Sequence, residues 1–130
     1  MVHKPAFYAD LLRQKIQHYG VQCWLVNTGW VGGPYGVGKR ISIRHTRNLL
    51  DAALEGALNG VEYYIDPVFG FEIPTRCPEV PEDVLYPARA WHNQDEYWKR
   101  YKQLASRFID NMKKFEIDTQ KDIIAAGPKI

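Results

Sequence analysis

Apolar residues recur at helical spacing in three long stretches of the chain. These are residues 5–19, 46–58 and 93–115. Each stretch gathers its leucine, isoleucine and aromatic residues on one side of a helix, which predicts three amphipathic helices. Thr46 suits the N-cap of the second helix. A short final helix is expected over residues 119–126, where a Gly-Pro pair closes it.

Short runs rich in β-branched and aromatic residues lie between these helices. The run VQCWLV, residues 21–26, is mostly apolar and is bounded by turn-forming residues, which predicts a buried strand. Residues 40–43 alternate as a half-buried strand does, and residues 61–65 are strand-like by composition. A further short strand is expected over residues 69–73.

The order of these elements predicts an α/β fold. A helix, then a strand, then a glycine-rich loop is typical of proteins that bind ligands beyond the carboxyl ends of their strands. We expect a short mixed sheet flanked by helices, in a single domain or fragment that spans residues 1–130. Residues 66–90 hold five of the eight prolines and predict a long packed loop. One helical turn is expected within it, over residues 82–85.

Size and composition argue against several classes of protein. The 130 residues are 45% hydrophobic and 25% charged, as in an ordinary globular domain. The net charge of +2 is weaker than nucleic-acid binders usually show, so no nucleic-acid partner is expected. No run is apolar enough for a membrane span and no signal peptide is recognisable, so no membrane partner is expected. The two cysteines lack redox or metal spacing, which favours a reduced, cytoplasmic protein.

The most informative stretch is residues 27–46, which hold five of the ten glycines. Within it, residues 33–39 match G-x-x-x-x-G-K, the first seven positions of a phosphate-binding P-loop. The eighth position should be a Ser or Thr that holds magnesium, and here it is Arg40. A predicted strand follows in place of a helix. We interpret the stretch as a loop that supplies part of a nucleotide site completed elsewhere. The alternatives are an ordered crossover loop and a true phosphate cradle.

No other motif provides a complete catalytic or metal-binding set. None of the four histidines has another histidine, cysteine or carboxylate at ligand spacing. His45 is closest to the glycine-rich stretch, and its position is more typical of a partly exposed histidine near a helix cap. We therefore assign no catalytic and no metal-ligating residue. Arg40 remains a candidate, because a guanidinium can stack on a purine and pair with ribose or phosphate oxygens.

Several segments resemble the C-terminal part of ATP-dependent phosphoenolpyruvate carboxykinase. They are NTGW, GGPYGVGKRISI, TRNLLDAALEGALNG, PVFGFEIPTRCPEVP and AAGP. Together they cover most of the chain. The resemblance implies the C-terminal portion of the mononucleotide-binding lobe of this lyase. Such an enzyme converts oxaloacetate and ATP to phosphoenolpyruvate, ADP and CO2 in cytoplasmic gluconeogenesis, with Mg2+ and usually Mn2+.

The resemblance also implies which residues bind the cofactor. The family pattern places the two residues after GK, and the threonine five residues later, on the adenine and ribose side of ATP. Here these are Arg40, Ile41 and Thr46. One departure is visible where the family commonly has Asn-Pro-Arg. This chain has Tyr86-Pro87-Ala88, with Arg89 displaced by one position.

The family's P-loop, metal ligands and oxaloacetate-binding residues lie upstream of the matched segments. We therefore expect this chain to act with an N-terminal remainder of the enzyme as its partner, to ligand neither Mg2+ nor Mn2+ itself, and to be inactive alone. The alternative is a free-standing module that binds nucleotides, anions or another protein without catalysis.

Overall fold

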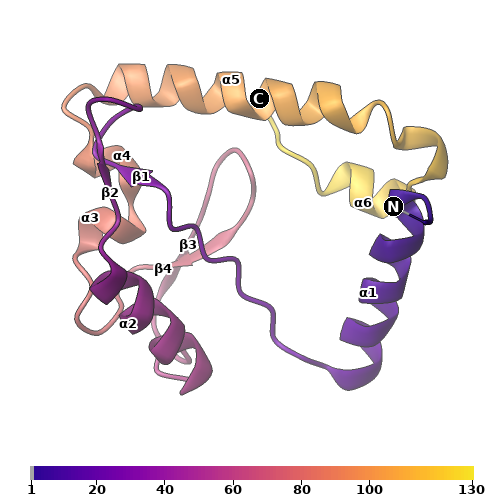
Figure 1. Ribbon diagram of the computed structural model, residues 1–130, viewed down its shortest axis with the longest axis horizontal. Coiled ribbons are helices and arrows are strands. Elements are labelled where there is room, and N and C mark those ends of the chain that lie inside the picture. Colours follow the sequence, from indigo (N-terminus) through magenta and orange to yellow (C-terminus); the bar gives the residue numbers. More distant parts are fainter. Residues whose placement is uncertain (1) are drawn as a thin grey trace.

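The computed structural model describes residues 2–130 and combines helices with two small sheets, which confirms the α/β class (Figure 1). The helices are α1 (Pro5–Tyr19), α2 (Ile43–Leu54), α3 (Glu82–Leu85), α4 (Pro87–Ala90), α5 (Gln94–Met112), the 3-10 helix η1 (Glu116–Asp118) and α6 (Lys121–Ala125). The strands are β1 (Trp30–Val31), β2 (Lys39–Arg40), β3 (Tyr63–Ile65) and β4 (Glu72–Pro74). Both sheets are two-stranded and antiparallel, β1 with β2 and β3 with β4.

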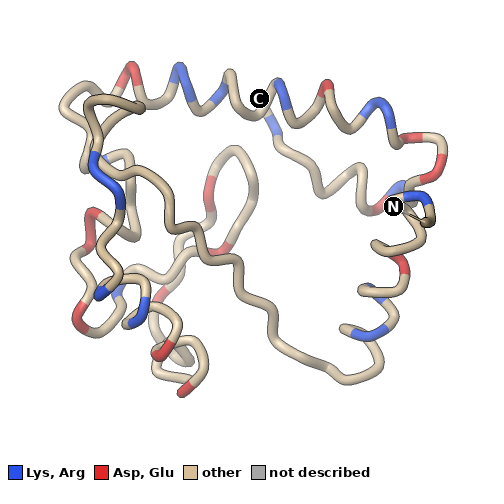
Figure 2. Tube along the Cα trace, viewed as in Figure 1, with Lys and Arg blue, Asp and Glu red and all other residues tan. Residues whose placement is uncertain are grey.

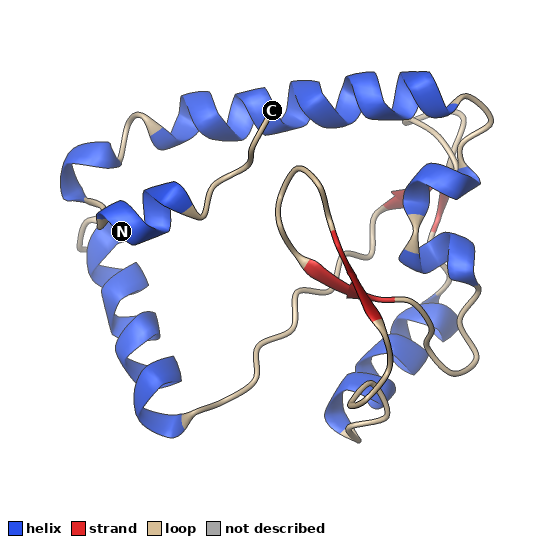
Figure 3. Cartoon of the chain, turned by 180° about the vertical axis from the view of Figure 1, so that it is seen from behind, coloured by secondary structure: helices blue, strands red, loops and turns tan. Residues whose placement is uncertain are grey.

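The elements are arranged openly around their connections. In Figure 1, α1 stands on one side with α6 next to its start, while α2 and both hairpins lie on the other side. The long helix α5 runs between the two sides. Residues 21–28 cross back from α1 to β1 as an extended segment, drawn without a strand in Figure 3. No residue of α1 is buried.

The strand predicted over residues 21–26 is wrong for the described chain. These residues are extended, but no segment of residues 2–130 forms a backbone ladder with them. A strand exists only when a neighbouring strand accepts and donates its hydrogen bonds. The apolar pattern was therefore present without the partner that would turn it into a sheet.

Local signals placed α1 correctly and α2 only approximately. Gly20 caps α1 in the left-handed conformation, with φ of 59°, as expected after residues 5–19. The second helix begins at Ile43 and ends at Leu54, so the predicted strand over residues 40–43 and the N-cap at Thr46 are both corrected. The N-cap is Ser42, whose Oγ accepts from the His45 N–H at 3.1 Å. Serine caps a helix as well as threonine does, and here it takes precedence.

The proline-rich stretch is more ordered than a loop. The helical turn expected over residues 82–85 is confirmed as α3, and α4 follows it unpredicted. The strand expected over residues 69–73 lies instead at β4. It is displaced because Asp66 organises the connection from β3 into a turn, and the Gly70 N–H donates to the Asp66 carbonyl oxygen at 3.0 Å.

The last part of the chain follows its capping signals. Asn93 Oδ1 accepts from the Glu96 N–H at 3.0 Å, which starts α5 as predicted. The final helix is shorter than the expected residues 119–126, because α6 begins at Lys121. None of the helices in residues 2–130 is both long and apolar enough to cross a membrane.

A small hydrophobic cluster joins α2 to the proline-rich stretch. Its buried members are Ala52, Leu58, Cys77 and Leu85, and its half-buried members are Trp24, Leu49, Ala53 and Val80. The cluster fixes α2 against α3, and these two helices carry parts of the site described below.

Asp66 is a buried carboxylate, and both of its oxygen atoms accept hydrogen bonds. It is 6% exposed, and its Oδ1 accepts from the backbone N–H groups of Val68 and Phe69 at 3.0 and 2.6 Å. Its Oδ2 accepts from the Tyr101 hydroxyl at 2.8 Å, which ties the β3–β4 connection to α5. Burial, and then the nearby Asp66 charge, raise the pKa of both Tyr64 and Tyr97 to about 12.

Candidate functional site

The glycine-rich stretch folds as a β-hairpin. Trp30 pairs with Arg40 and Val31 with Lys39, so the loop over residues 32–38 joins two antiparallel strands. Pro34 closes the loop tip, because its carbonyl oxygen accepts from the Val37 and Gly38 N–H groups at 3.0 and 2.9 Å. This geometry differs from a P-loop, in which the loop enters a helix whose N-terminus faces the phosphates.

Two glycines of this loop are required by geometry. Gly36 has φ of 88°, a left-handed conformation that disfavours any other residue. At Gly38 a Cβ atom would lie 2.5 Å from the Gly33 carbonyl oxygen, closer than any side chain tolerates. The glycines therefore allow a tight hairpin, and their density needs no bound phosphate to explain it.

The hairpin leads directly into the first turn of α2. The Ile41 N–H donates to the Gly29 carbonyl oxygen at 3.0 Å, which extends the hairpin by one bond beyond β2. Ser42 then caps α2, and Thr46 follows in its first turn. The Thr46 hydroxyl donates to the Ser42 carbonyl oxygen at 3.2 Å, so its proton is already engaged while its oxygen can still accept a hydrogen bond.

A hollow of about 450 Å³ lies between this hairpin and the α3–α4 pair. Arg40 and Ile41 line it, together with His45 and with Asp83 of α3. Thr46, the third residue expected to bind the cofactor, is not part of the lining, although it lies one residue beyond His45. The structure thus brings Arg40 and Ile41 into one hollow and leaves Thr46 next to it.

The hollow combines one apolar wall with charges of both signs. Ile41, Val31 and Val84 supply the apolar surface, while Lys39 and Arg40 supply positive charge. Within residues 2–130, neither cation forms an ion pair, whereas Arg44 in the first turn of α2 pairs with Glu79 at 3.0 Å. An apolar surface next to unpaired cations fits a flat, partly anionic ligand such as a nucleotide.

His45 holds the one buried side-chain polar atom without a partner in the described part of the chain. Its Nδ1 neither donates to nor accepts from another group. Leaving a buried polar atom unpaired costs about 1–3 kcal/mol, so such atoms call for a functional or structural reason. His45 as a residue lines the hollow and is partly exposed next to the Ser42 cap, which confirms the expectation of a partly exposed histidine near a helix cap.

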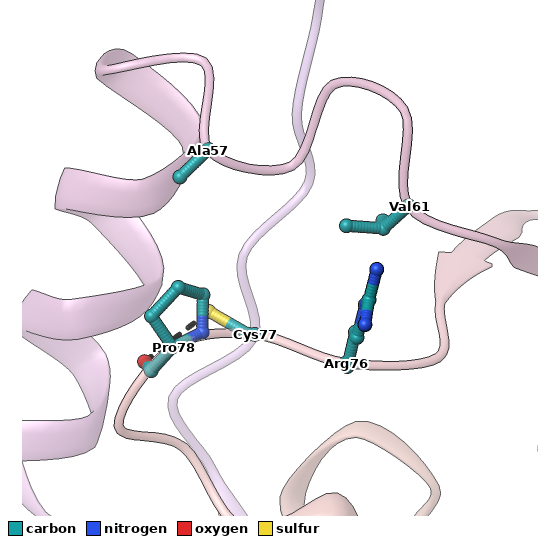
Figure 4. A pocket seen from close by; sticks show the side chains of 5 residues that line it. All are labelled: Ala57, Val61, Arg76, Cys77 and Pro78. Atoms are coloured by element: carbon teal, nitrogen blue, oxygen red, sulfur yellow. Dashed lines mark hydrogen bonds between the residues drawn. The ribbon is translucent and has the colours of Figure 1, made fainter.

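A second hollow, of about 390 Å³, is not a catalytic candidate (Figure 4). Its walls are Ala57, Val61, Arg76, Cys77 and Pro78. The Cys77 thiol is free and lies 3.7 Å from the Pro78 carbonyl oxygen. Burial raises the pKa of this thiol, which disfavours the thiolate that a nucleophile requires.

Arg89, displaced by one position from the family pattern, is occupied within its own region. It pairs with Glu82 at 3.2 Å and lies over the Tyr86 ring at 5.0 Å from the centroid. These contacts join α3 to α4. Arg89 does not line the hollow around Arg40.

Sequence reasoning missed the far wall of the hollow. Asp83, Val84 and Ala90 come from helices about forty residues further along the chain. Nothing in their local pattern marks them, because only the tertiary packing of α3 and α4 against the hairpin brings them there. Among residues 2–130, no group of three His, Cys, Asp or Glu side chains is placed to hold a metal ion, so these residues do not fit a divalent cation.

Comparisons with known proteins agree on one family. A family model described as phosphoenolpyruvate carboxykinase matches residues 1–83. The phosphoenolpyruvate carboxykinase (ATP) of Alkaliphilus oremlandii is 49% identical over 130 residues, which is all of this chain and 24% of the relative. The proteins of the same name from Caldanaerobacter subterraneus and Rhodopseudomonas palustris are 47% and 46% identical over 96% and 97% of the chain. The chain spans about a quarter of the length of these relatives.

Proposed function

The chain belongs to the ATP-dependent phosphoenolpyruvate carboxykinase family, and from this we propose that it forms the adenine and ribose side of an ATP site. The observation that carries the proposal is the hollow of about 450 Å³ with Arg40 and Ile41 in its wall. In the proposed complex the Arg40 guanidinium stacks on the purine or pairs with ribose oxygens, and Ile41 covers an apolar edge. Thr46 offers its hydroxyl oxygen as an acceptor to the exocyclic amine of adenine.

The triphosphate and the metal ions lie elsewhere in this proposal. The loop over residues 32–38 leads into β2 rather than into a helix, and the position after Lys39 is an arginine that cannot ligand Mg2+. We propose that an N-terminal remainder of the enzyme supplies the phosphate cradle, the Mg2+ and Mn2+ ligands and the oxaloacetate site. Metal ions there neutralise the charge of the transferring phosphoryl group.

For the whole enzyme we propose the reaction that gives its relatives their name, phosphoenolpyruvate carboxykinase (ATP). Oxaloacetate loses CO2, and the enolate oxygen that results takes the γ-phosphoryl group of ATP, which gives phosphoenolpyruvate and ADP. We propose that the enzyme serves gluconeogenesis in the cytoplasm. The 130 residues alone should form no phosphoenolpyruvate when mixed with oxaloacetate, ATP and Mn2+, since positioning and charge neutralisation provide most of the catalysis of phosphoryl transfer.

The test is a titration of the 130-residue chain with fluorescent ATP, with adenosine and inorganic triphosphate as competitors. We expect adenosine to compete and triphosphate to compete poorly. Arg40→Ala should weaken ATP binding roughly tenfold, the value of one charge-assisted contact. Arg107→Ala is the matched control, because Arg107 is an exposed arginine of α5 outside the hollow.

Competition by triphosphate alone would instead support a free-standing anion-binding module, a reading favoured by the two unpaired cations in the hollow. Equal losses for Arg40→Ala and Arg107→Ala would contradict a specific site. Phosphoenolpyruvate formed by the chain alone would contradict the proposal that the phosphate, metal and oxaloacetate sites lie on an N-terminal remainder.

A further inference from the structure

The far wall of the hollow around Arg40 carries a carboxylate to which the ATP site proposed above assigns no role. Asp83, in the first turn of α3, lines the same hollow as Lys39 and Arg40 of β2. Figure 2 shows the blue of β2 and the red of α3 on the same side of the molecule. Within residues 2–130, the Asp83 carboxylate forms no ion pair with either cation and accepts no hydrogen bond, so its acceptor oxygens are available to a ligand.

The acidic residues on either side of Asp83 in the sequence are already paired. Glu79 pairs with Arg44 at 3.0 Å, and Glu82 pairs with Arg89 at 3.2 Å. An acidic residue in a first turn also interacts favourably with the helix dipole. However, α3 has only four residues, and Glu82 already occupies that turn. The dipole therefore gives little reason for a second carboxylate, and none for its place at the hollow.

Contacts within the chain hold the wall that carries Asp83 against the hairpin. A Cβ atom added at Gly32 would lie 3.4 Å from the Ala90 carbonyl oxygen, so the hairpin touches the end of α4. Asn48 Nδ2 of α2 donates to the Glu79 carbonyl oxygen at 3.1 Å, shortly before α3 begins. With the hydrophobic cluster between α2 and α3, these contacts fix the width of the hollow. A carboxylate held in this way can select a ligand by shape as well as by charge.

A ligand group that lies between a cation and a carboxylate has to accept from one and donate to the other. Phosphate oxygens only accept, and the charge of Asp83 repels them. The exocyclic amine of adenine only donates, and the proposed site gives it to Thr46. A hydroxyl group does both at once, because its oxygen accepts from Arg40 while its proton goes to Asp83. Within ATP, the ribose is the part that carries hydroxyl groups.

We propose that the Asp83 carboxylate accepts hydrogen bonds from the ribose hydroxyl groups of the nucleotide and thereby selects ribonucleotides over deoxyribonucleotides. The inference rests on the proposed ATP site and adds to it the residue that sets sugar specificity. Acidic side chains bind ribose hydroxyls in the same way in dinucleotide-binding folds. The like charge of Asp83 also directs the triphosphate toward the opposite end of the site.

The test compares ATP with 2′-deoxy-ATP and 3′-deoxy-ATP as competitors of ATP that is labelled on its γ-phosphate. The 130-residue chain is used. Loss of a hydroxyl that donates to Asp83 should weaken binding about tenfold or more, since the bond is charge-assisted and the carboxylate is left without its donor. We expect this loss for at least one of the two analogues, and the analogue with the larger loss identifies the hydroxyl.

Three variants assign the sugar preference to the carboxylate. Asp83→Ala should reduce the ratio of the two dissociation constants, deoxy analogue to ATP, to about one, since no acceptor remains. Asp83→Asn retains one acceptor oxygen and should give an intermediate ratio. Asp95→Ala is the matched control, because Asp95 is an exposed acidic residue in the first turn of α5, outside the hollow, and its ratio should equal that of the wild type. Circular dichroism verifies that each variant is folded.

Three results would overturn the inference and leave the ATP site standing. The first is equal binding of ATP and both deoxy analogues by the wild-type chain. The second is a sugar preference that survives Asp83→Ala. The third is a loss, in that variant, of the preference for ATP over purine riboside triphosphate with the sugar preference intact, which would assign the carboxylate to the base. A wild-type chain that binds no ATP would instead refute the proposed site and this inference together, so the two failures are distinguishable.

Discussion

Two connections of similar apolar character end in opposite states. The turn that follows β3 pairs a buried carboxylate with two backbone N–H groups and a tyrosine hydroxyl, so its polar atoms are satisfied within the chain. Residues 21–28 have no such partner in the described chain, and their apolar side chains remain largely exposed. The first region is complete by itself, and the second has the pattern of a buried strand without the sheet.

This difference shows which parts of the chain are stabilised by contacts within the chain itself. The aromatic residues around the Asp66 turn contact one another, with Phe69 against Tyr101 and Phe108 at ring-centroid distances of 5.3 and 5.5 Å. Such contacts contribute to stability without any other polypeptide. The hollow around Arg40 lies between these extremes, since its walls are formed within the described chain but its cations, Lys39 and Arg40, form no ion pair there.

The largest effect on this comparison should come from Asp66→Ala. The change leaves two N–H groups and the Tyr101 hydroxyl without their acceptor, which should lower the free energy of unfolding by about 3 kcal/mol. Urea unfolding followed by circular dichroism measures it. Asp66→Asn keeps one acceptor oxygen in place and should cost less. Equal losses for both variants would show that the charge, rather than the acceptor, holds the turn.

A smaller effect should appear at alkaline pH in the same region. The pKa values of Tyr64 and Tyr97 are about 12 in the folded chain, above the ordinary value of 10.0. The folded state therefore holds these protons more tightly than the unfolded state. Their contribution to stability is complete below pH 10 and is lost as pH rises through 12. Urea midpoints below and within this window measure the loss, and a constant midpoint would contradict it.

The smallest effect should come from Leu25→Asp in the isolated chain. Because Leu25 is 80% exposed there, its replacement should change the free energy of unfolding by less than about 0.5 kcal/mol. Thermal and urea unfolding of the 130 residues measure this. A loss comparable to that of Asp66→Ala would mean that residues 21–28 are already packed in the isolated chain, which would remove the contrast between the two regions.

The elements that could be predicted from sequence are those fixed by neighbours along the chain. Gly20 ends α1 and the Asn93–Glu96 pair starts α5, because both act over three or four residues. The start of α2 was misplaced because Ser42 and Thr46 are both good caps. The strand predicted over residues 21–26 could not be decided from the apolar pattern alone, because a strand also requires a neighbouring strand that exchanges hydrogen bonds with it.

The residues of the candidate site also fall into two groups, those that local sequence could indicate and those that only tertiary packing brings to the site. The hairpin that carries Arg40 and Ile41 is local, so these two residues could be proposed as a pair from the glycine spacing and the family resemblance. The wall formed by Asp83 and Ala90 depends on tertiary packing and left no mark in the sequence. The unpaired Nδ1 of His45 is likewise a property of the folded surroundings and not of the histidine's position.

The attachment of α1 has a mechanical consequence. Exposed ion pairs connect α1 to the end of the chain, Lys4 with Asp118 at 3.0 Å and Arg13 with Asp122 at 3.2 Å. Dissolved salt screens such pairs, and each contributes little. At the other end of α1, Gly20 has no atom near the position of a Cβ. The contacts at the start of α1 should therefore loosen as the salt concentration rises, while Gly20, at the other end, adds no side-chain contact.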